Sequence, residues 1–497
     1  MLTPAHRIHQ VIGDEFARLA SNIPDSQTDG SSTQAISYVL RLLRERELHG
    51  IEHLQRQFKQ LDEIIQAIKT TTASSGVDIS TELSSLEGNL QEFDEQKPLD
   101  TLEEVWRQSL FLVEDAVSKI QSDSEIAGTA KEKLLHNLVN FESTDLVEQL
   151  GSESRHTESD TDFKITPDKL TAYLRDRFED SSIVVKTLHP LSGGFGKETI
   201  VFTTVGNALN GEFVMRRDIG DNATLNNDCH YIQKEYEVIK AVRARGYLSP
   251  DTLWLDTEHS LLPGSHFIVM RRSPGRQGGS FFGAQTEIPA NLTNILAKHT
   301  ALLHTLPPLT ELGDLTESIN HQRWNLSRKE STECYLRDWY HYWRNETHTP
   351  SPALASLYGW LFDNLPDRQG SPSMLHGDIG FHNILLENEE LTVILDWEFA
   401  HIGDPAEELG YVKVTTGGAL NWDLFMKRYI AAGGEPVDDK TLLFFQIWAY
   451  VRNASAANII STRFLTGKAD DLKLCVLPYM HIPHFIRAAQ ALIKQAA

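Results

Sequence analysis

The stretch from Met374 to Glu408 concentrates the side chains of this sequence that are best suited to chemistry. Asp378 and Asn383 precede one short apolar run and Asp396 follows another, at residues 384–386 and 393–395. A polar turn separates the two runs, so the pattern predicts a β-hairpin with a polar loop at either end. Such a hairpin brings these side chains to one edge of a small sheet. Hard oxygen ligands beside a carboxylate suit phosphoryl transfer from a magnesium-bound nucleotide.

A glycine-rich segment lies upstream, between two β-rich stretches at residues 183–191 and 199–205. It contains three glycines within four residues, Gly193, Gly194 and Gly196. Glycine lets backbone N–H groups approach a phosphate closely, and we therefore predict that these residues contact the nucleotide. Glycine-rich hairpins are common, so this prediction depends on the elements downstream in the chain.

A third strand, at residues 213–217, ends in Arg216 and Arg217, and the helix predicted at residues 228–245 carries Glu235. A cation on the third strand that pairs with a helical glutamate holds nucleotide phosphates in kinase folds. The strand register leaves either arginine open for this position. We predict Arg216, with Glu235 as its partner.

The composition narrows the class of protein. A formal net charge of −23 disfavours nucleic acid as a partner, because phosphate affinity depends on clustered Lys and Arg. No apolar run reaches transmembrane length and the first residues do not resemble a signal peptide, so we expect a cytoplasmic protein without a membrane partner. Three scattered cysteines argue against a disulfide framework or a zinc site, namely Cys229, Cys334 and Cys475.

Residues 1–150 are helical by pattern. One apolar seam has a spacing of three and four residues and comprises Ile51, Leu54, Phe58, Leu61, Ile65 and Ile68. This pattern predicts an all-α bundle or hairpin, whose stripes we interpret as core. The seam also leaves open a homodimer or a protein partner bound through these helices.

The remaining chain divides by composition into a linker and two lobes. Residues 151–165 are polar and rich in turn formers, which predicts a linker. Thr166-Pro167 then begins a helix. We predict a β-rich N-terminal lobe that binds nucleotide over residues 166–272. A mostly helical C-terminal lobe, with the catalytic loop and the metal and acceptor sites, follows over residues 273–497.

Three motifs carry a resemblance to a known family. They are His376-Gly377-Asp378 through Asn383, Ile394-Leu395-Asp396-Trp397-Glu398, and Gly403-Asp404-Pro405. Together with the upstream elements they resemble the aminoglycoside phosphotransferase-like kinases, which are relatives of choline kinase. The resemblance covers about residues 166–490. The form DWEFAHIGDPAEELGY is most similar to the branch of hydroxyacyl-CoA and hydroxy-acid kinases.

The resemblance implies an α+β, protein-kinase-like fold of two lobes, preceded here by the all-α domain. It implies that Asp378 orients an acceptor hydroxyl and takes its proton, while Asn383 and Asp396 hold Mg²⁺ on ATP or another nucleoside triphosphate. His376 and Asp404 are expected to brace the catalytic loop, and His382 is expected to be structural. One departure is that arginine replaces the lysine usual on the third strand, although arginine can also clamp phosphate oxygens.

These observations lead us to expect an ATP-dependent O-phosphotransferase that acts on a small hydroxylated metabolite, such as a hydroxyacyl-CoA or a hydroxy acid. One alternative is an aminoglycoside or macrolide phosphotransferase. Another is a non-catalytic kinase-fold scaffold that binds a partner through its N-terminal helices. The presence of Asp378, Asn383 and Asp396 weighs against the scaffold.

Overall fold

The structure is a computed structural model that describes residues 8, 11–12, 30–73, 75–150, 165–191, 197–218, 231–259, 261, 266–279, 287–307, 321–467 and 472–496. The predicted linker lies outside this set except for Ile165, as do Gly193, Gly194 and Gly196. The chain divides into two compact units. The first contains residues 1–159, 339–365 and 450–497, and the second contains residues 160–338 and 366–449.

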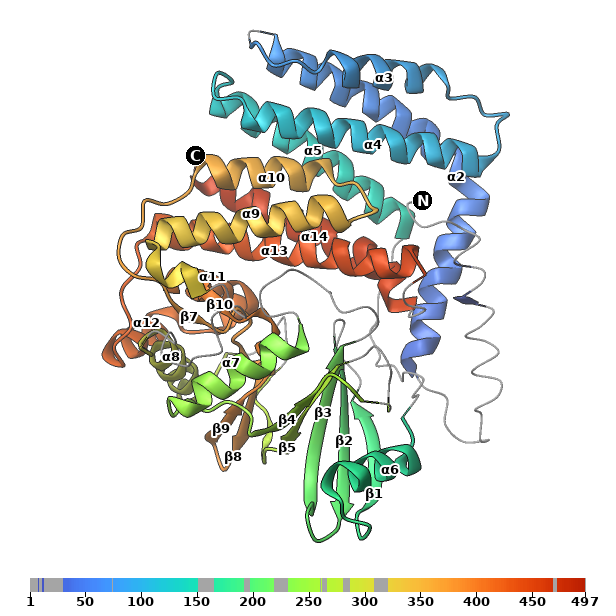
Figure 1. The fold of residues 1–497 in the computed structure, drawn as a ribbon. Helices are drawn as coiled ribbons and strands as arrows, with labels where there is room; N and C mark the ends of the chain where they lie inside the picture. Colours follow the sequence, from blue (N-terminus) through green and yellow to red (C-terminus); the bar gives the residue numbers. More distant parts are fainter. Residues whose placement is uncertain are drawn as a thin grey trace. The chain divides into compact units, whose positions relative to one another are not determined.

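The second unit contains a five-stranded antiparallel sheet in the order β1-β2-β3-β5-β4 (Figure 1). Its strands are β1 (Val184–Leu191), β2 (Lys197–Val205), β3 (Gly211–Asp218), β4 (Thr252–Asp256) and β5 (Phe267–Arg271). Two helices belong to this part, α6 (Pro167–Phe178) and α7 (Ile232–Ala244). Thr166 caps α6 by accepting the N–H of Lys169 at 3.3 Å, as expected for Thr before Pro.

The two faces of this sheet pack against different helices, because successive side chains of a strand point to opposite faces. On β3, Phe213 and Met215 join a core with the α6 residues Leu170 and Leu174. The alternate position Val214 packs with the core that contains α7. Arg216 therefore belongs to the face that carries α7, and the next residue belongs to the face that carries α6.

The rest of the second unit is mostly helical around short strands. The predicted hairpin is confirmed as β8 (Ile384–Glu387) and β9 (Glu390–Ile394), with β6 (Arg276–Gln277) paired to β8. A second small sheet pairs β7 (Ser373–Leu375) with β10 (His401–Gly403). The described part of this unit also contains short 3₁₀ helices, η2 (His321–Asn325), η3 (Phe381–Asn383), η4 (Trp397–Phe399) and η5 (Gly417–Ala419). The helices wholly within this part are α8 (Ala290–His304), α11 (Pro405–Thr416) and α12 (Trp422–Ala431).

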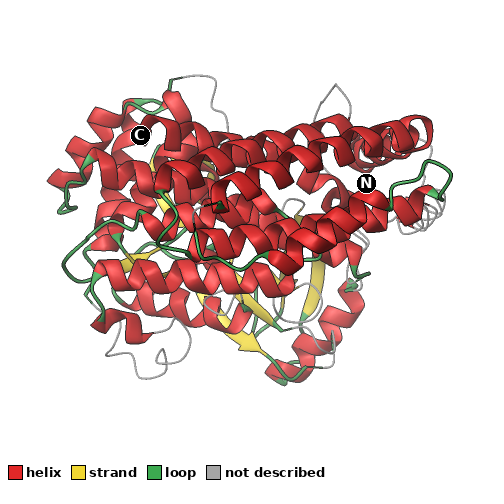
Figure 2. Cartoon of the chain, turned by 90° about the horizontal axis from the view of Figure 1, so that it is seen from above, coloured by secondary structure: helices red, strands yellow, loops and turns green. Residues whose placement is uncertain are grey.

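The first unit is helical, and helices also make up most of the described chain as a whole (Figure 2). Its N-terminal helices are α2 (Gly30–Thr72), α3 (Ser80–Gln91), α4 (Leu99–Ser122) and α5 (Gly128–Leu150). They pack with α10 (Pro352–Asp363) and α14 (Leu472–Ala496), and two further helices contribute residues to both units, α9 (Arg328–Glu346) and α13 (Asp439–Leu465). Residues 339–365 and 450–497, which the sequence analysis assigned to the C-terminal lobe, thus group with the N-terminal helices. The lobe boundaries themselves remain predictions.

The predicted seam of α2 is buried within the first unit except at Ile51. From Leu54 to Ile68 its members are at most 4% exposed, because α2 packs against α4 and α5 of the same chain. Burial of this area accounts for the seam without a second chain.

Among the described helices, none combines the length and the apolar character needed to cross a membrane. Two cysteines fall in the described residues, Cys334 at an exposed position and Cys475 at a buried one.

Candidate active site

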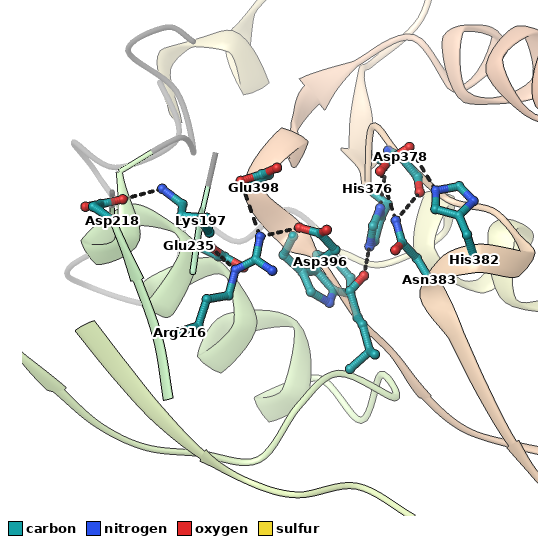
Figure 3. Close-up of polar contacts among 12 residues, drawn as sticks. Lys197, Arg216, Asp218, Glu235, His376, Asp378, His382, Asn383, Asp396 and Glu398 are labelled. Atoms are coloured by element: carbon teal, nitrogen blue, oxygen red, sulfur yellow. Dashed lines mark hydrogen bonds and ion pairs between the residues drawn. The ribbon is translucent and has the colours of Figure 1, made fainter. Parts of the chain in front are cut away.

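Asp378 lies in the loop between β7 and η3, where its buried carboxylate receives hydrogen bonds from three side chains, of which Figure 3 shows those of His382 and Asn383. Asn383 donates its amide to Oδ2 at 2.9 Å, and also to the Asp378 carbonyl at 2.9 Å. His382 Nε2 lies 3.3 Å from Oδ1, and the Tyr411 hydroxyl donates to the same oxygen. The loop therefore holds the side chain of Asp378 from several directions.

These partners keep Asp378 ionised. Burial alone would raise the pKa of this carboxyl, but the charge and hydrogen bond of His382 and the hydroxyl of Tyr411 lower the pKa to about 2. A carboxylate with so low a pKa stays ionised at neutral pH, so it can accept a hydrogen bond from an O–H group, and it holds a proton only weakly.

The turn before Asp378 depends on Gly377, whose φ of +78° lies in the left-handed region. A Cβ on this residue would lie 2.2 Å from the carbonyl oxygen of Phe399, so only glycine fits. Its N–H donates to the buried carboxylate of Glu408 at 2.8 Å. His376 Nε2 donates to the carbonyl of Leu395 at 2.8 Å, while its Nδ1 accepts the Asp378 N–H at 3.3 Å. His376 thus connects the loop to the end of β9.

Asp404 supports a different element from the one expected. It caps α11 by accepting the N–H of Ala406 at 2.9 Å, and it pairs with Arg368 at 2.8 Å. Both contacts fix the first residues of α11. Asp404 thus affects the catalytic loop indirectly, because Glu408 and Tyr411 of α11 form hydrogen bonds with that loop.

Arg216 joins three acidic side chains, one from α7 and two from η4 and its N-cap. Its guanidinium lies 3.1 Å from Glu235 of α7, contacts Asp396, and lies 3.3 Å from Glu398 (Figure 3). Burial lowers the pKa of this arginine, but the surrounding carboxylates raise it above its usual value, so the guanidinium remains charged. The structure thus brings Arg216 and Glu235 together.

Arg217 takes part in a separate contact on the opposite face of the sheet. It pairs with Glu198, its neighbour on β2. The alternation of strand side chains explains why the two adjacent arginines have different partners.

Asp396 has an unusual backbone, with φ +66° and ψ +67°, immediately before η4. This left-handed conformation is uncommon for a residue with a side chain and is often found where function fixes a side chain's direction. It places the Asp396 carboxylate against Arg216.

Glu398 is a member of this cluster that the sequence reasoning missed. Burial and the nearby charge of Asp396 raise the pKa of Glu398 to about 8, although Arg216 opposes the shift. The signal was present in the sequence, since Glu398 stands two residues after Asp396 in the same motif.

Lys197 is a second missed residue. It begins β2 opposite Asp218 in the register and forms a buried ion pair with it. Asp218 also accepts the N–H of Ile232, the first residue of α7, at 3.3 Å. Burial raises the pKa of Glu235 and of Glu398, and the positive charge of Lys197 opposes both shifts. Arg216 and Asp218 are two positions apart on β3, so their side chains point to the same face of the sheet. This spacing is the sequence signal that could have placed Asp218, and its partner Lys197, on the face of Arg216.

The two residues that the sequence analysis predicts as magnesium ligands, Asn383 and Asp396, both carry side-chain oxygen atoms. Asn383 has an amide oxygen and Asp396 a carboxylate, which agrees with the sparse protein ligation typical of Mg²⁺ bound mainly through phosphates and water. Within the described ranges, no cluster of three or more His, Cys, Asp and Glu side chains is arranged to hold a metal. Two protein ligands leave the other positions around such an ion to oxygen atoms of a nucleotide and of water.

Residues 187–444, more than half of the 497 residues, match the phosphotransferase enzyme family. Among curated proteins, acyl-CoA dehydrogenase family member 11 of Homo sapiens is 29% identical over 189 residues, which are 37% of this chain and 23% of that protein. The Gallus gallus protein of the same name is 24% identical over 269 residues, 49% of this chain and 33% of that protein. The chain spans no more than about a third of the length of these two relatives.

Two solved structures are also similar to parts of the chain. Aminoglycoside phosphotransferase APH(4)-Ia has a TM-score of 0.46 at 13% identity, over 67% of this chain and 100% of the other. Macrolide 2′-phosphotransferase MphH from Brachybacterium faecium has a TM-score of 0.39 at 17% identity, over 59% and 97%.

The family match agrees with the observed architecture, in which an antiparallel sheet and a largely helical remainder follow a helical N-terminal region. The predicted α+β, kinase-like fold class is confirmed. The chain belongs to the phosphotransferase enzyme family.

Proposed function

We propose that this protein is an ATP-dependent O-phosphotransferase that acts on a small hydroxylated metabolite, with Mg²⁺ bound to the nucleotide. The observation that carries the proposal is the buried, ionised carboxylate of Asp378, held beside Asn383 in a chain that also brings Asp396 to the Arg216–Glu235 pair. Phosphoryl transfer needs an oriented acceptor and charge neutralisation more than it needs covalent chemistry.

Each residue has a role that follows from its surroundings. Asp378 accepts a hydrogen bond from the acceptor hydroxyl, orients its oxygen toward the γ-phosphate and receives the proton as the oxygen attacks. Asn383 and Asp396 would hold Mg²⁺, which supplies positive charge to the phosphate oxygens. Arg216 supplies a fixed positive charge beside Asp396, and Glu235 keeps its guanidinium in place.

For the acceptor, we favour a hydroxyacyl-CoA. The form of the motif from Asp396 to Tyr411 supports this choice, and so do the names of the curated relatives, which are acyl-CoA dehydrogenase family members. A hydroxyl on an acyl chain would supply the nucleophile that Asp378 is arranged to orient.

The test is an acceptor screen. The full chain is incubated with Mg²⁺, ATP and one acceptor at a time, drawn from 3- and 4-hydroxyacyl-CoA thioesters, free hydroxy acids, aminoglycosides and macrolides, while ADP release is followed. Asp378→Asn is the blank, since loss of a well-placed acid–base group costs on the order of 10²-fold or more in rate. Asp423→Asn, on an exposed position of α12, is the matched control and should retain full rate.

The outcomes separate the candidate functions. ADP release that depends on a hydroxyacyl-CoA and disappears in Asp378→Asn supports the proposal, whereas turnover of an antibiotic alone would support the alternative acceptor class. Equal rates for the parent chain and Asp378→Asn would refute the role of this residue. If a thermal-shift titration detects no binding of Mg·ATP, the non-catalytic scaffold becomes the better explanation.

A further inference from the structure

Helix α11 directs two buried side chains to the loop that carries Asp378. Glu408 and Tyr411 are three positions apart and therefore share one face of the helix. Glu408 accepts the N–H of Gly377 at 2.8 Å, and the hydroxyl of Tyr411 donates to Oδ1 of Asp378. Helix α11 thus forms hydrogen bonds with both the backbone of this loop, at Gly377, and the carboxylate of Asp378.

We propose that Tyr411 is a positioning residue for phosphoryl transfer, whose hydroxyl fixes the rotation of the Asp378 carboxylate so that its other oxygen faces the acceptor. This inference rests on the proposed function. The terminal torsion of an aspartate is broad, so burial alone does not select one direction for its two oxygens. A donor aimed at one oxygen makes that selection.

The division of partners between the two oxygens supports this role. Oδ1 accepts hydrogen bonds from Tyr411 and His382, whereas Oδ2 accepts a hydrogen bond from the amide of Asn383. His382 and Asn383 lie only 4 and 5 residues after Asp378 in the same short segment, but Tyr411 comes from α11. Its hydroxyl ties the carboxylate to a separate element.

That element is itself held firmly at the position of Glu408. The Glu408 carboxylate accepts a hydrogen bond from His304 Nε2 at 2.8 Å, and His304 Nδ1 lies 2.7 Å from the hydroxyl of Tyr429. Glu408 therefore connects α8 and α12 with the N–H of Gly377. Because Glu408 and Tyr411 belong to one helix, the contacts of Glu408 also fix the position of the Tyr411 hydroxyl.

The decisive variant is Tyr411→Phe, which keeps the buried ring and removes only the hydroxyl. Tyr173→Phe is a matched control, because Tyr173 in α6 also donates its hydroxyl to a carboxylate, that of Asp256, at 2.6 Å. We expect kcat with ATP and 3-hydroxybutyryl-CoA to fall roughly 10- to 100-fold in Tyr411→Phe, as for other small losses of alignment. The KM for ATP should stay within about twofold, and Tyr173→Phe should leave kcat unchanged.

A double-variant cycle distinguishes positioning of Asp378 by Tyr411 from a general loss of order in the active site. In the Asp378→Asn background, Tyr411→Phe should cause no further loss of rate, because the carboxylate that it orients is absent. Crystal structures of the parent and of Tyr411→Phe give a readout that needs no turnover, and we expect Asp378 to adopt a different side-chain rotation in the variant.

Two results would overturn the inference. One is a Tyr411→Phe rate within twofold of the parent, and the other is an unchanged Asp378 rotation in the crystal of the variant. If the parent chain transfers no phosphoryl group to any acceptor, the proposed function fails, while the crystal comparison still decides whether Tyr411 positions Asp378.

Discussion

Arg216 forms an ion pair with Asp396, and the two residues are 180 positions apart in the chain. The arginine belongs to the five-stranded sheet, and the aspartate follows the β8–β9 hairpin. This contact connects the phosphate half of the proposed site with its metal half. It is the reason that Arg216 is the first residue to test.

Replacing Arg216 with Met should lower stability as well as nucleotide binding. The change leaves the buried Glu235 without its cation, and breaking a buried pair typically costs about 3–5 kcal/mol. Arg216→Lys should retain the fold but bind ATP more weakly, because a single ammonium cannot contact three carboxylates in the same geometry. Denaturant unfolding and ATP titration measure the two effects.

Arg217→Lys is the control for this experiment, since Arg217 pairs with Glu198 on the other face of the sheet. Its affinity for ATP should match that of the parent. A loss of affinity as large as in Arg216→Lys would contradict the assignment of the two arginines.

The buried pair of Lys197 and Asp218 predicts a second stability effect. Lys197→Met removes the cation beside a buried aspartate and should destabilise the fold by about 3–5 kcal/mol. The double variant Lys197→Met with Asp218→Leu should recover much of this loss, since apolar replacement of a buried pair is often neutral. Urea denaturation of the parent, both single variants and the double variant measures the coupling. Simple additivity of the two single losses would show that the residues do not interact.

The first unit should become less stable as the pH rises toward neutrality. Burial raises the pKa of Glu142 to about 7, although hydrogen bonds from Ser351 and from the N–H of Ala353 oppose the shift. Because the folded-state pKa exceeds the unfolded value of about 4.5, the protonated acid stabilises the fold fully below pH 4.5. That contribution disappears as the pH passes 7, on the order of 3 kcal/mol in total.

Melting temperatures between pH 5 and pH 8 test this prediction. The parent should lose stability over that range more steeply than Glu142→Gln, which cannot ionise. Glu125→Gln, at an exposed position, should follow the parent curve. Parallel curves for the parent and Glu142→Gln would refute the assigned titration.

The N-terminal helices should be required for folding of residues 339–365 and 450–497. Helices α4 and α5 cover α10, and α5 packs along α14. Glu114 accepts the N–H of Ser351, and Lys131 pairs with Asp363 at 2.8 Å. A fragment beginning at residue 165 would expose these faces to water, so we expect it to aggregate on gel filtration.

The control for the truncation is a chain cut by a protease at a site inserted within residues 151–164. Its two pieces should stay together on gel filtration, because the helix contacts of the first unit are intact. A monomeric 165–497 fragment that melts at the temperature of the parent would contradict the prediction.

The local features of the fold could be predicted from the sequence because they depend on local patterns. Alternating apolar runs around a polar turn predicted the β8–β9 hairpin, and Thr before Pro predicted the start of α6. The residues of the catalytic loop, Asp378 and Asn383, could be predicted because their types and spacing form a recognisable motif.

Other features depend on contacts between distant segments. The apolar seam of α2 was visible in the sequence, but periodicity shows which side of a helix is buried and not which helix covers it. Glu398 stands in a motif that the sequence shows, but its partner on β3 could not be predicted, and neither could the partner of Tyr411 in the β7–η3 loop. The backbone turn at Asp396 has no sequence signal, since a non-glycine residue seldom adopts a positive φ.

The contact between Arg216 and Asp396 also has a consequence for the order in which ligands bind. A free divalent cation approaching Asp396 would have to displace a guanidinium that is already its counter-ion. A cation carried on a triphosphate brings phosphate oxygens that the guanidinium can take in exchange. If Asp396 binds Mg²⁺ as proposed, the arginine would favour a metal ion that arrives bound to its nucleotide.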